Sequence, residues 1–83
     1  MYQVVITPSA QRQLDKLERN IQVRVLAHIR ELANNPCPPG AIKLEGTDAY
    51  RIRVGAYRII YTIEDGVHYV WVIRIAHRRE AYR

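Results

Sequence analysis

The chain has 83 residues, which is room for one domain, residues 1–83, and not for two, because independent domains usually need at least about 50 residues each. It has no apolar run near the ~20 residues of a membrane span, no signal peptide and a single cysteine, so we expect a cytoplasmic protein without a disulfide or a membrane partner. The net charge of +5 favours a polyanion, nucleic acid above all, as partner, against the alternative of a merely basic soluble protein.

The first 34 residues are predicted to form a strand and two helices. Alternation over residues 2–6 indicates a strand, and Thr7 followed by Pro8 is typical of the cap and first turn of a helix. Apolar residues then recur at helical spacing in two stripes, which predicts a helical hairpin. The stripes consist of Ala10, Leu14 and Leu17, and of Ile21, Val25, Ile29 and Leu32.

A loop and three strands are predicted for the remainder. Residues 35–49 contain three of the four prolines, and the last 34 residues alternate with a period of two. Gly55-Ala56 and Asp65-Gly66 are typical of two-residue hairpin turns, of type II′ and type I′ respectively. We therefore expect an α+β fold of order β-α-α-β-β-β, with a helical hairpin packed on one face of a small, mainly antiparallel sheet.

The positive charge lies mainly in the predicted sheet. Residues 1–49 carry six basic and five acidic side chains, whereas residues 50–83 carry seven arginines and three acids. The first hairpin turn places Arg53 opposite Arg58, with Arg51 on the same face, and like charges directly opposite one another are destabilising. We expect an anion to bind between these arginines; three arginines extended into solvent are the alternative.

The same face is predicted to carry aromatic side chains. A two-residue second turn pairs Thr62 with Tyr69, which brings Tyr69, Trp71 and Ile73 to the face of the arginines. Aromatic rings beside arginines suit base stacking next to a bound phosphate. For Trp71 we favour packing in the core or against a partner protein.

No metal or cofactor site is predicted. Cys37 lies in a proline-rich loop, and the chain lacks CxxC and HExxH metal-binding motifs. It also lacks the GxxxxGK[ST], GxGxxG and GxSxG motifs of nucleotide-binding proteins and serine hydrolases.

Two segments resemble the RelE branch of the RelE/ParE toxin superfamily: residues 44–61, LEGTDAYRIRVGAYRIIY, and residues 75–82, IAHRREAY. The resemblance spans nearly the whole chain and implies a RelE-like fold. It implies the toxin of a type II toxin-antitoxin system, a ribosome-dependent endoribonuclease (mRNA interferase) that cleaves translated messenger RNA and inhibits translation. The implied partners are a cognate antitoxin, the ribosome and mRNA, and a toxin-antitoxin complex that can bind operator DNA through the antitoxin.

The resemblance also implies site residues by position. The basic pair of the family falls on Arg51 and Arg53, and its remaining positions fall on Arg58, Arg78 and Tyr82. The RNA-binding set is then Arg51, Arg53, Arg58, Arg78, Arg79 and Arg83. Some relatives have lysine at the first two positions, and arginine is too basic to accept a proton in their place.

The residue types then suggest a metal-independent mechanism. The 2′-hydroxyl of RNA attacks the adjacent phosphate, and Arg51, Arg53 and Arg58 stabilise the developing charge. Arg78 holds or neutralises the leaving side, and Tyr82 stacks on a base or assists proton transfer. His77 is the candidate general base, because imidazole has an ordinary pKa near about 6.5, and a plain hydrogen-bonding role is the alternative. The competing functions are a gyrase-inhibiting toxin of the ParE kind and a noncatalytic nucleic-acid-binding module.

Overall fold

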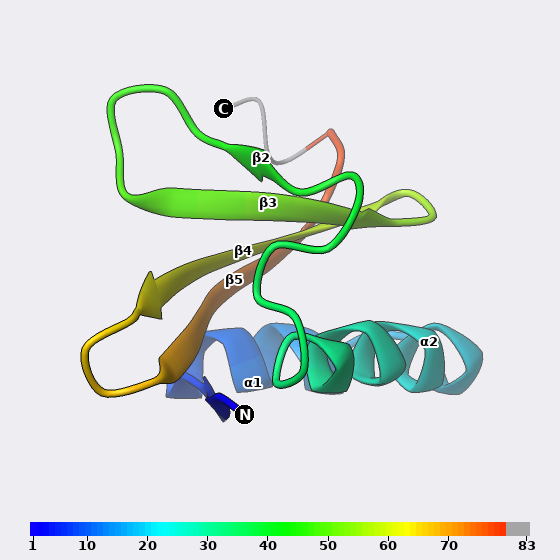
Figure 1. Ribbon diagram of the computed structural model, residues 1–83. Coiled ribbons are helices and arrows are strands. Elements are labelled where there is room, and N and C mark those ends of the chain that lie inside the picture. Colours follow the sequence, from blue (N-terminus) through cyan, green and yellow to red (C-terminus); the bar gives the residue numbers. More distant parts are fainter. Residues whose placement is uncertain (80–83) are drawn as a thin grey trace.

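The computed structural model describes residues 1–79 as two helices packed on a five-stranded mixed sheet (Figure 1). The elements are β1 (Gln3–Ile6), α1 (Pro8–Asp15), α2 (Arg19–Glu31), β2 (Ile42–Lys43), β3 (Ala49–Val54), β4 (Tyr57–Glu64) and β5 (Tyr69–His77). The strand order is β1-β5-β4-β3-β2, in which β1 runs parallel to β5 and the other neighbours are antiparallel. The predicted α+β fold is confirmed, with β2 as an additional strand.

The helices cover one face of the sheet and leave the other face open. Apolar side chains of both helices meet alternate residues of β3, β4 and β5 in one core. The buried members are Ala10, Leu14, Val25, Ile29, Leu32, Ile52, Val54, Ile59, Tyr61, Val70, Val72 and Ile75. Within residues 1–79 no helix is long and apolar enough to cross a membrane.

The start of α1 follows the predicted capping chemistry. The Thr7 hydroxyl accepts a hydrogen bond from the Ala10 amide at 3.3 Å, and Pro8 occupies the first turn, where no amide donor is needed. At the other end, the Gln22 side-chain amide donates to the Leu14 carbonyl at 3.0 Å. The break between the helices is thus stabilised from α2.

The predicted loop over residues 35–49 contains strand β2, which sequence reasoning missed. Ile42 pairs with Arg51 and Lys43 with Tyr50, and the Leu44 amide donates to the Ala49 carbonyl at 2.8 Å. Two residues are too short a run to show alternation, so the pattern could not reveal this strand. Its pairing covers only the first half of the β3 edge.

The predicted two-residue turn at Asp65-Gly66 is wrong. Residues 65–68 form a longer connection, and Thr62 pairs with Trp71 rather than with Tyr69. The positive φ of this loop falls on His68, at 56°, where Tyr2 packs its ring at 5.0 Å and donates its hydroxyl to Asp65 at 2.6 Å. Contacts with the N-terminal segment therefore override the local turn preference. The hydrogen bond to Asp65 also raises the pKa of Tyr2.

Tyr61 joins the sheet to the proline-rich loop. Its ring is fully buried and its hydroxyl donates to the Pro36 carbonyl at 2.6 Å. Burial, which disfavours the phenolate, raises the pKa of Tyr61 to about 12. The loop is thereby held over the end of the core.

Candidate functional site

The arginines of β3 and β4 lie on the open face of the sheet, as predicted. Gly55 has the positive φ, 60°, that a two-residue turn of type II′ requires at its first position. The resulting register pairs Arg53 with Arg58 and Arg51 with Ile60. Arg53 is exposed, whereas Arg51 and Arg58 are half-buried and their Nε atoms are shielded from solvent.

A bulge in β5 adds Arg74 to this face, which sequence reasoning missed. The register shifts between Ile60 and Tyr61, so that Arg74 pairs with Ile60 and Ile73 is the extra residue. Without the shift, Arg74 would point into the core and Ile75 away from it, because side chains alternate along a strand. The Ile75 amide beyond the bulge donates to the Gln13 side chain of α1 at 2.7 Å.

Three arginines line one cavity at the end of the sheet where the β3–β4 turn lies beside the end of β5 (Figure 1). Its volume is about 310 Å³, and its lining residues are Arg53, Gly55, Ala56, Tyr57, Arg58 and Arg78. Arg78 follows β5 directly and donates its amide to the Ala56 carbonyl at 2.7 Å. We call this the arginine cavity. No carboxylate is among these lining residues of the described chain, so the cavity is strongly positive.

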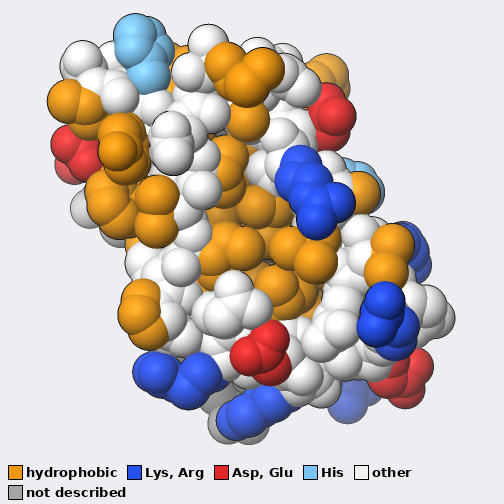
Figure 2. All heavy atoms as spheres, turned by 90° about the horizontal axis from the view of Figure 1, so that it is seen from below, with side chains coloured by type: hydrophobic (Ala, Val, Ile, Leu, Met, Phe, Trp, Pro, Cys, Tyr) orange, Lys and Arg blue, Asp and Glu red, His pale blue; other side chains and the backbone are white. Residues whose placement is uncertain are grey.

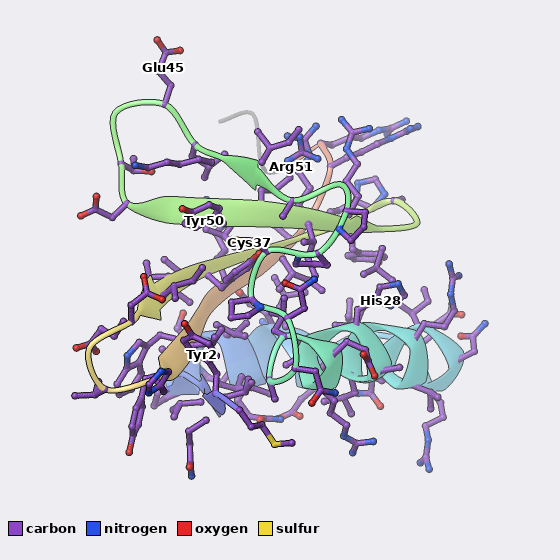
Figure 3. All side chains as sticks on the ribbon, in the orientation of Figure 1. Tyr2, His28, Cys37, Glu45, Tyr50 and Arg51 are labelled. Atoms are coloured by element: carbon purple, nitrogen blue, oxygen red, sulfur yellow. The ribbon has the colours of Figure 1, made fainter. Side chains whose placement is uncertain are left out.

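Arg51 and Arg53 also line a neighbouring groove at the open part of the β3 edge. It has a volume of about 310 Å³ and lies between β3, the proline loop and α2. From α2 it receives His28 and Glu31. Figure 3 shows Arg51 on the β3 side of this region and His28 on the helix below it. The side chain of His28 is exposed.

Arg24 of α2 reaches the β3–β4 turn, which the sequence pattern did not indicate. A Cβ atom added to Gly55 would lie 3.5 Å from Nη2 of Arg24. Helical periodicity places Arg24 on the polar side of α2, yet periodicity cannot tell that the hairpin turn lies over that side. The positive charge around the arginine cavity is therefore larger than the sequence analysis implied.

His77 lies on the other side of the sheet from the paired arginines. It pairs with Tyr57, which pairs with the buried Val54, so its side chain shares the helix-covered face. Its ring packs edge-on against Tyr57 at 5.3 Å. It lines a separate cavity of about 290 Å³ with Gln13 of α1 and Lys16, the residue that caps this helix. The structure therefore does not bring His77 together with Arg53 and Arg58.

The structure describes the tail of the chain as far as residue 79. Arg79 is exposed and its amide donates to Nδ1 of His77 at 3.3 Å. Tyr82 and Arg83 lie outside the described residues.

Aromatic side chains occupy the far end of the open face. Tyr69 and Trp71 stack with centroids 5.5 Å apart, and the Trp71 indole donates to Glu64 at 2.7 Å. The corrected register differs by two residues, so these rings keep the predicted face. Trp71 is half-buried rather than part of the core.

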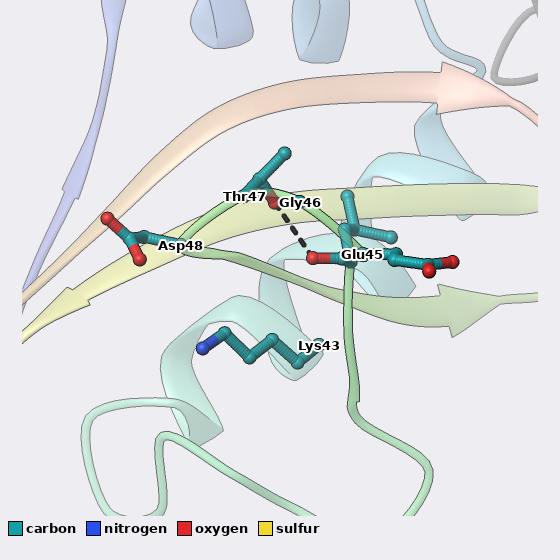
Figure 4. Close-up of a pocket in the computed structure, with 6 residues that line it drawn as sticks. Lys43, Glu45, Gly46, Thr47 and Asp48 are labelled. Carbon is teal, nitrogen blue, oxygen red and sulfur yellow. Dashed lines mark hydrogen bonds between the residues drawn. The ribbon is translucent and has the colours of Figure 1, made fainter.

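The remaining hollows carry less chemistry. A hollow of about 590 Å³ lies under the β2–β3 turn, where exposed Lys43, Glu45 and Asp48 mix both charges and Thr47 donates to the Leu44 carbonyl at 3.1 Å (Figure 4). Cys37 lies in the proline loop, as predicted, and its side chain is exposed. Among residues 1–79, no three His, Cys, Asp or Glu side chains gather in a metal-binding arrangement.

The sequence is similar to two known toxins over almost its whole length. A family model described as "ParE toxin of type II toxin-antitoxin system, parDE" matches residues 4–82. Toxin RelE of Mycobacterium tuberculosis is 38% identical over 86 residues, which cover 99% of this chain and 87% of that protein. Toxin RelG of the same organism is 32% identical over 84 residues, which cover 99% of this chain and 97% of that protein.

Solved structures with a similar fold include toxins in complex with antitoxins. In the toxin-antitoxin complex RelBE2 of M. tuberculosis, the matching chain has a TM-score of 0.82 and 31% identity, covering 93% of this chain and 98% of that one. In the archaeal RelE-RelB complex of Pyrococcus horikoshii, the matching chain has a TM-score of 0.84 and 31% identity, covering 93% of this chain and 94% of that one.

Proposed function

Because this chain belongs to the RelE/ParE superfamily and is a RelE-like toxin of a type II toxin-antitoxin system, we propose that it is an endoribonuclease that cleaves messenger RNA on the ribosome. The observation that carries the proposal is the arginine cavity, in which Arg53, Arg58 and Arg78 converge from three different segments. Guanidinium groups bind phosphate oxygens in pairs, so three of them around one small volume suit a single phosphodiester.

The reaction needs neither a metal ion nor water. The 2′-oxygen attacks the adjacent phosphorus, the bond from phosphorus to the 5′-oxygen breaks, and the products are a 2′,3′-cyclic phosphate and a 5′-hydroxyl. One proton leaves the 2′-hydroxyl and one is taken up by the leaving oxygen. Negative charge accumulates on the phosphorane between these events, and fixed positive charge stabilises it.

The described arginines have distinct parts in this reaction. Arg53 and Arg58 approach the phosphate from the sheet, and Arg78 approaches from the tail. Arg51 lines the neighbouring groove and not the arginine cavity, so we assign it, with Arg79, to the flanking RNA instead of to charge stabilisation. Tyr82, at the family's tyrosine position, remains the candidate for base stacking or proton transfer. Arg83 extends the RNA-binding set at the chain end.

The partner of this toxin is a cognate antitoxin. The similar structures RelBE2 and RelE-RelB are toxin-antitoxin complexes, and the present chain has hydrophobic surface to cover. Seen from the helix side, hydrophobic side chains form a continuous, hollowed area with Lys and Arg at its edges (Figure 2). Val23 on α2 is more than half exposed. An antitoxin that joins apolar and acidic side chains fits this surface.

Primer extension on translated messages tests the proposed activity. Brief expression of the chain should produce new 5′ ends within a reporter message, and the same message without a start codon should remain intact. Arg53→Ala should produce no new ends. A loss of DNA supercoiling with intact messages would favour gyrase inhibition and contradict the proposal.

A further inference from the structure

Arg78 is held by hydrogen bonds at both of its peptide groups. Its own amide donates to the Ala56 carbonyl at 2.7 Å, on the turn that joins the other two arginine-bearing strands. The next amide, that of Arg79, donates to Nδ1 of His77 at 3.3 Å. The Cα atom of Arg78 lies between these two bonds, so both of them fix where its side chain starts.

The His77 ring that accepts the second bond is itself fixed. Tyr57 meets it edge-on, with centroids 5.3 Å apart and an angle of 86° between the ring planes. Gln13 of α1 and the next residues of the chain, Lys16 and Leu17, line the cavity on the same side. His77 is half-buried there, and it is not among the residues that line the arginine cavity.

We propose that His77 is a positioning residue, whose Nδ1 lone pair holds the Arg79 amide and thereby places Arg78 in the arginine cavity. This inference rests on the proposed function, and it replaces the general-base role that the residue type suggested. The geometry requires Nδ1 to be unprotonated, so that the ring proton is on Nε2. A general base would need to reach the 2′-hydroxyl on the other side of the sheet.

Two substitutions by amide side chains, Asn and Gln, distinguish the positioning role of His77 from a general-base role. In His77→Asn, the side-chain oxygen occupies nearly the position of Nδ1 and can accept the amide two residues on, as in an Asx turn. In His77→Gln the oxygen lies one carbon farther out, near the position of Nε2. Neither side chain accepts a proton near neutral pH, so neither can serve as a general base.

Single-turnover cleavage on programmed ribosomes is the first measurement. We expect His77→Asn to stay within about threefold of the wild-type rate, and His77→Gln and His77→Ala to fall at least tenfold. An Asn variant as slow as the Ala variant would overturn the inference, and so would an Ala variant with the wild-type rate. If the Ala variant does not fold, the comparison of Asn with Gln decides.

Amide exchange of Arg79 in the full chain is the second measurement, and it does not depend on activity. The amide should be protected in the wild type and in His77→Asn, and should exchange faster in His77→Gln. Equal exchange in all three proteins would overturn the inference even if the wild type cleaves RNA. The expected exchange pattern in a chain that cleaves no message would instead refute the proposed function and leave the positioning role standing.

Discussion

Arg53 and Arg58 face one another on neighbouring strands, and like charges directly opposite one another are destabilising. Arg53 is the more exposed of the two and lines both the arginine cavity and the neighbouring groove. We therefore expect its guanidinium to contribute to binding without supporting the core. Removal of Arg53 should separate activity from stability.

We expect Arg53→Ala to abolish messenger cleavage while the free energy of unfolding stays the same or rises by a few tenths of a kcal/mol, within the roughly 0.2–1 kcal/mol of a cross-strand pair. Thermal melts and the cleavage assay measure the two effects. Arg12→Ala, an exposed change on α1, is the control and should retain activity. A marked drop in the melting temperature of Arg53→Ala would mean that Arg53 supports the fold.

Sequence reasoning could predict the Arg53–Arg58 pair because one glycine fixes the register of the first hairpin. It could not predict the position of Arg74, which depends on a bulge, or that of Arg24, which depends on how α2 crosses the hairpin turn. Its base candidate, His77, came from residue type alone. Side chains alternate between the two faces along β5, and the bulge shifts this alternation by one residue. The face that His77 occupies therefore depends on the bulge.

At the scale of elements, the β3–β4 turn sets the geometry of the cavity. Gly55 combines a φ of 60° with the close approach of Arg24. An L-residue pays about 1–2 kcal/mol for a left-handed conformation. The turn is therefore sensitive to any side chain at this position.

Gly55→Ala should lower the free energy of unfolding by about 1–2 kcal/mol, because the added Cβ strains the turn. Denaturant unfolding measures the change. Gly66→Ala is the matched control, since Gly66 has no positive φ and open space around its Cβ position, and it should be neutral or slightly stabilising. Equal effects of the two substitutions would contradict the assigned turn.

Tyr61 joins β4 to the proline loop, and its ionisation makes the free energy of unfolding depend on pH in the alkaline range. Its pKa is raised from an ordinary 10 to about 12, so its stabilising effect is complete below pH 10. As the pH rises through 12, the unfolded chain ionises first and up to about 2–3 kcal/mol is lost. Tyr61→Phe should remove this part of the alkaline loss. It should also cost about 1 kcal/mol at neutral pH, because the Pro36 carbonyl loses its donor.

Denaturant unfolding between pH 9 and about pH 12 measures this difference. Tyr57→Phe, which leaves the Tyr61 hydroxyl in place, should retain the wild-type pH dependence. Identical alkaline curves for wild type and Tyr61→Phe would show that another group is responsible.

The second hairpin shows where local patterns fail. Asp65-Gly66 is typical of a tight turn, yet Tyr2 and the β1 strand hold a longer loop through Asp65 and His68. Such contacts join residues more than sixty positions apart and leave no local signal. The face of Tyr69 was still predicted correctly, because a shift of two residues preserves the parity of a strand.

For the whole molecule, the uneven charge is the main feature. The last 34 residues hold seven arginines against three acids, and the structure gathers at least three of them around one cavity. We expect a cell to block such a surface when the proposed nuclease is not needed. An acidic segment that folds on binding is suited to do so.

We therefore expect the cognate antitoxin to contain an acidic segment that is disordered when free and to bind this toxin less tightly as salt rises. Titration calorimetry of the toxin with that segment at several salt concentrations measures this. Arg53→Ala should weaken the salt dependence, whereas Arg12→Ala should not. Isolation of the toxin as a free monomer from cells that also express the antitoxin would contradict the expectation.

Above all, we propose that this protein cleaves RNA by attack of the 2′-hydroxyl inside the arginine cavity. The most direct test is cleavage of a message on programmed ribosomes by the purified toxin, with the cut site mapped and a single 2′-deoxynucleotide then placed just upstream of the cut. Our account predicts a 2′,3′-cyclic phosphate and a 5′-hydroxyl on the normal message and no cleavage at the deoxy position. Cleavage that persists at the deoxy position, or an intact normal message, would contradict it.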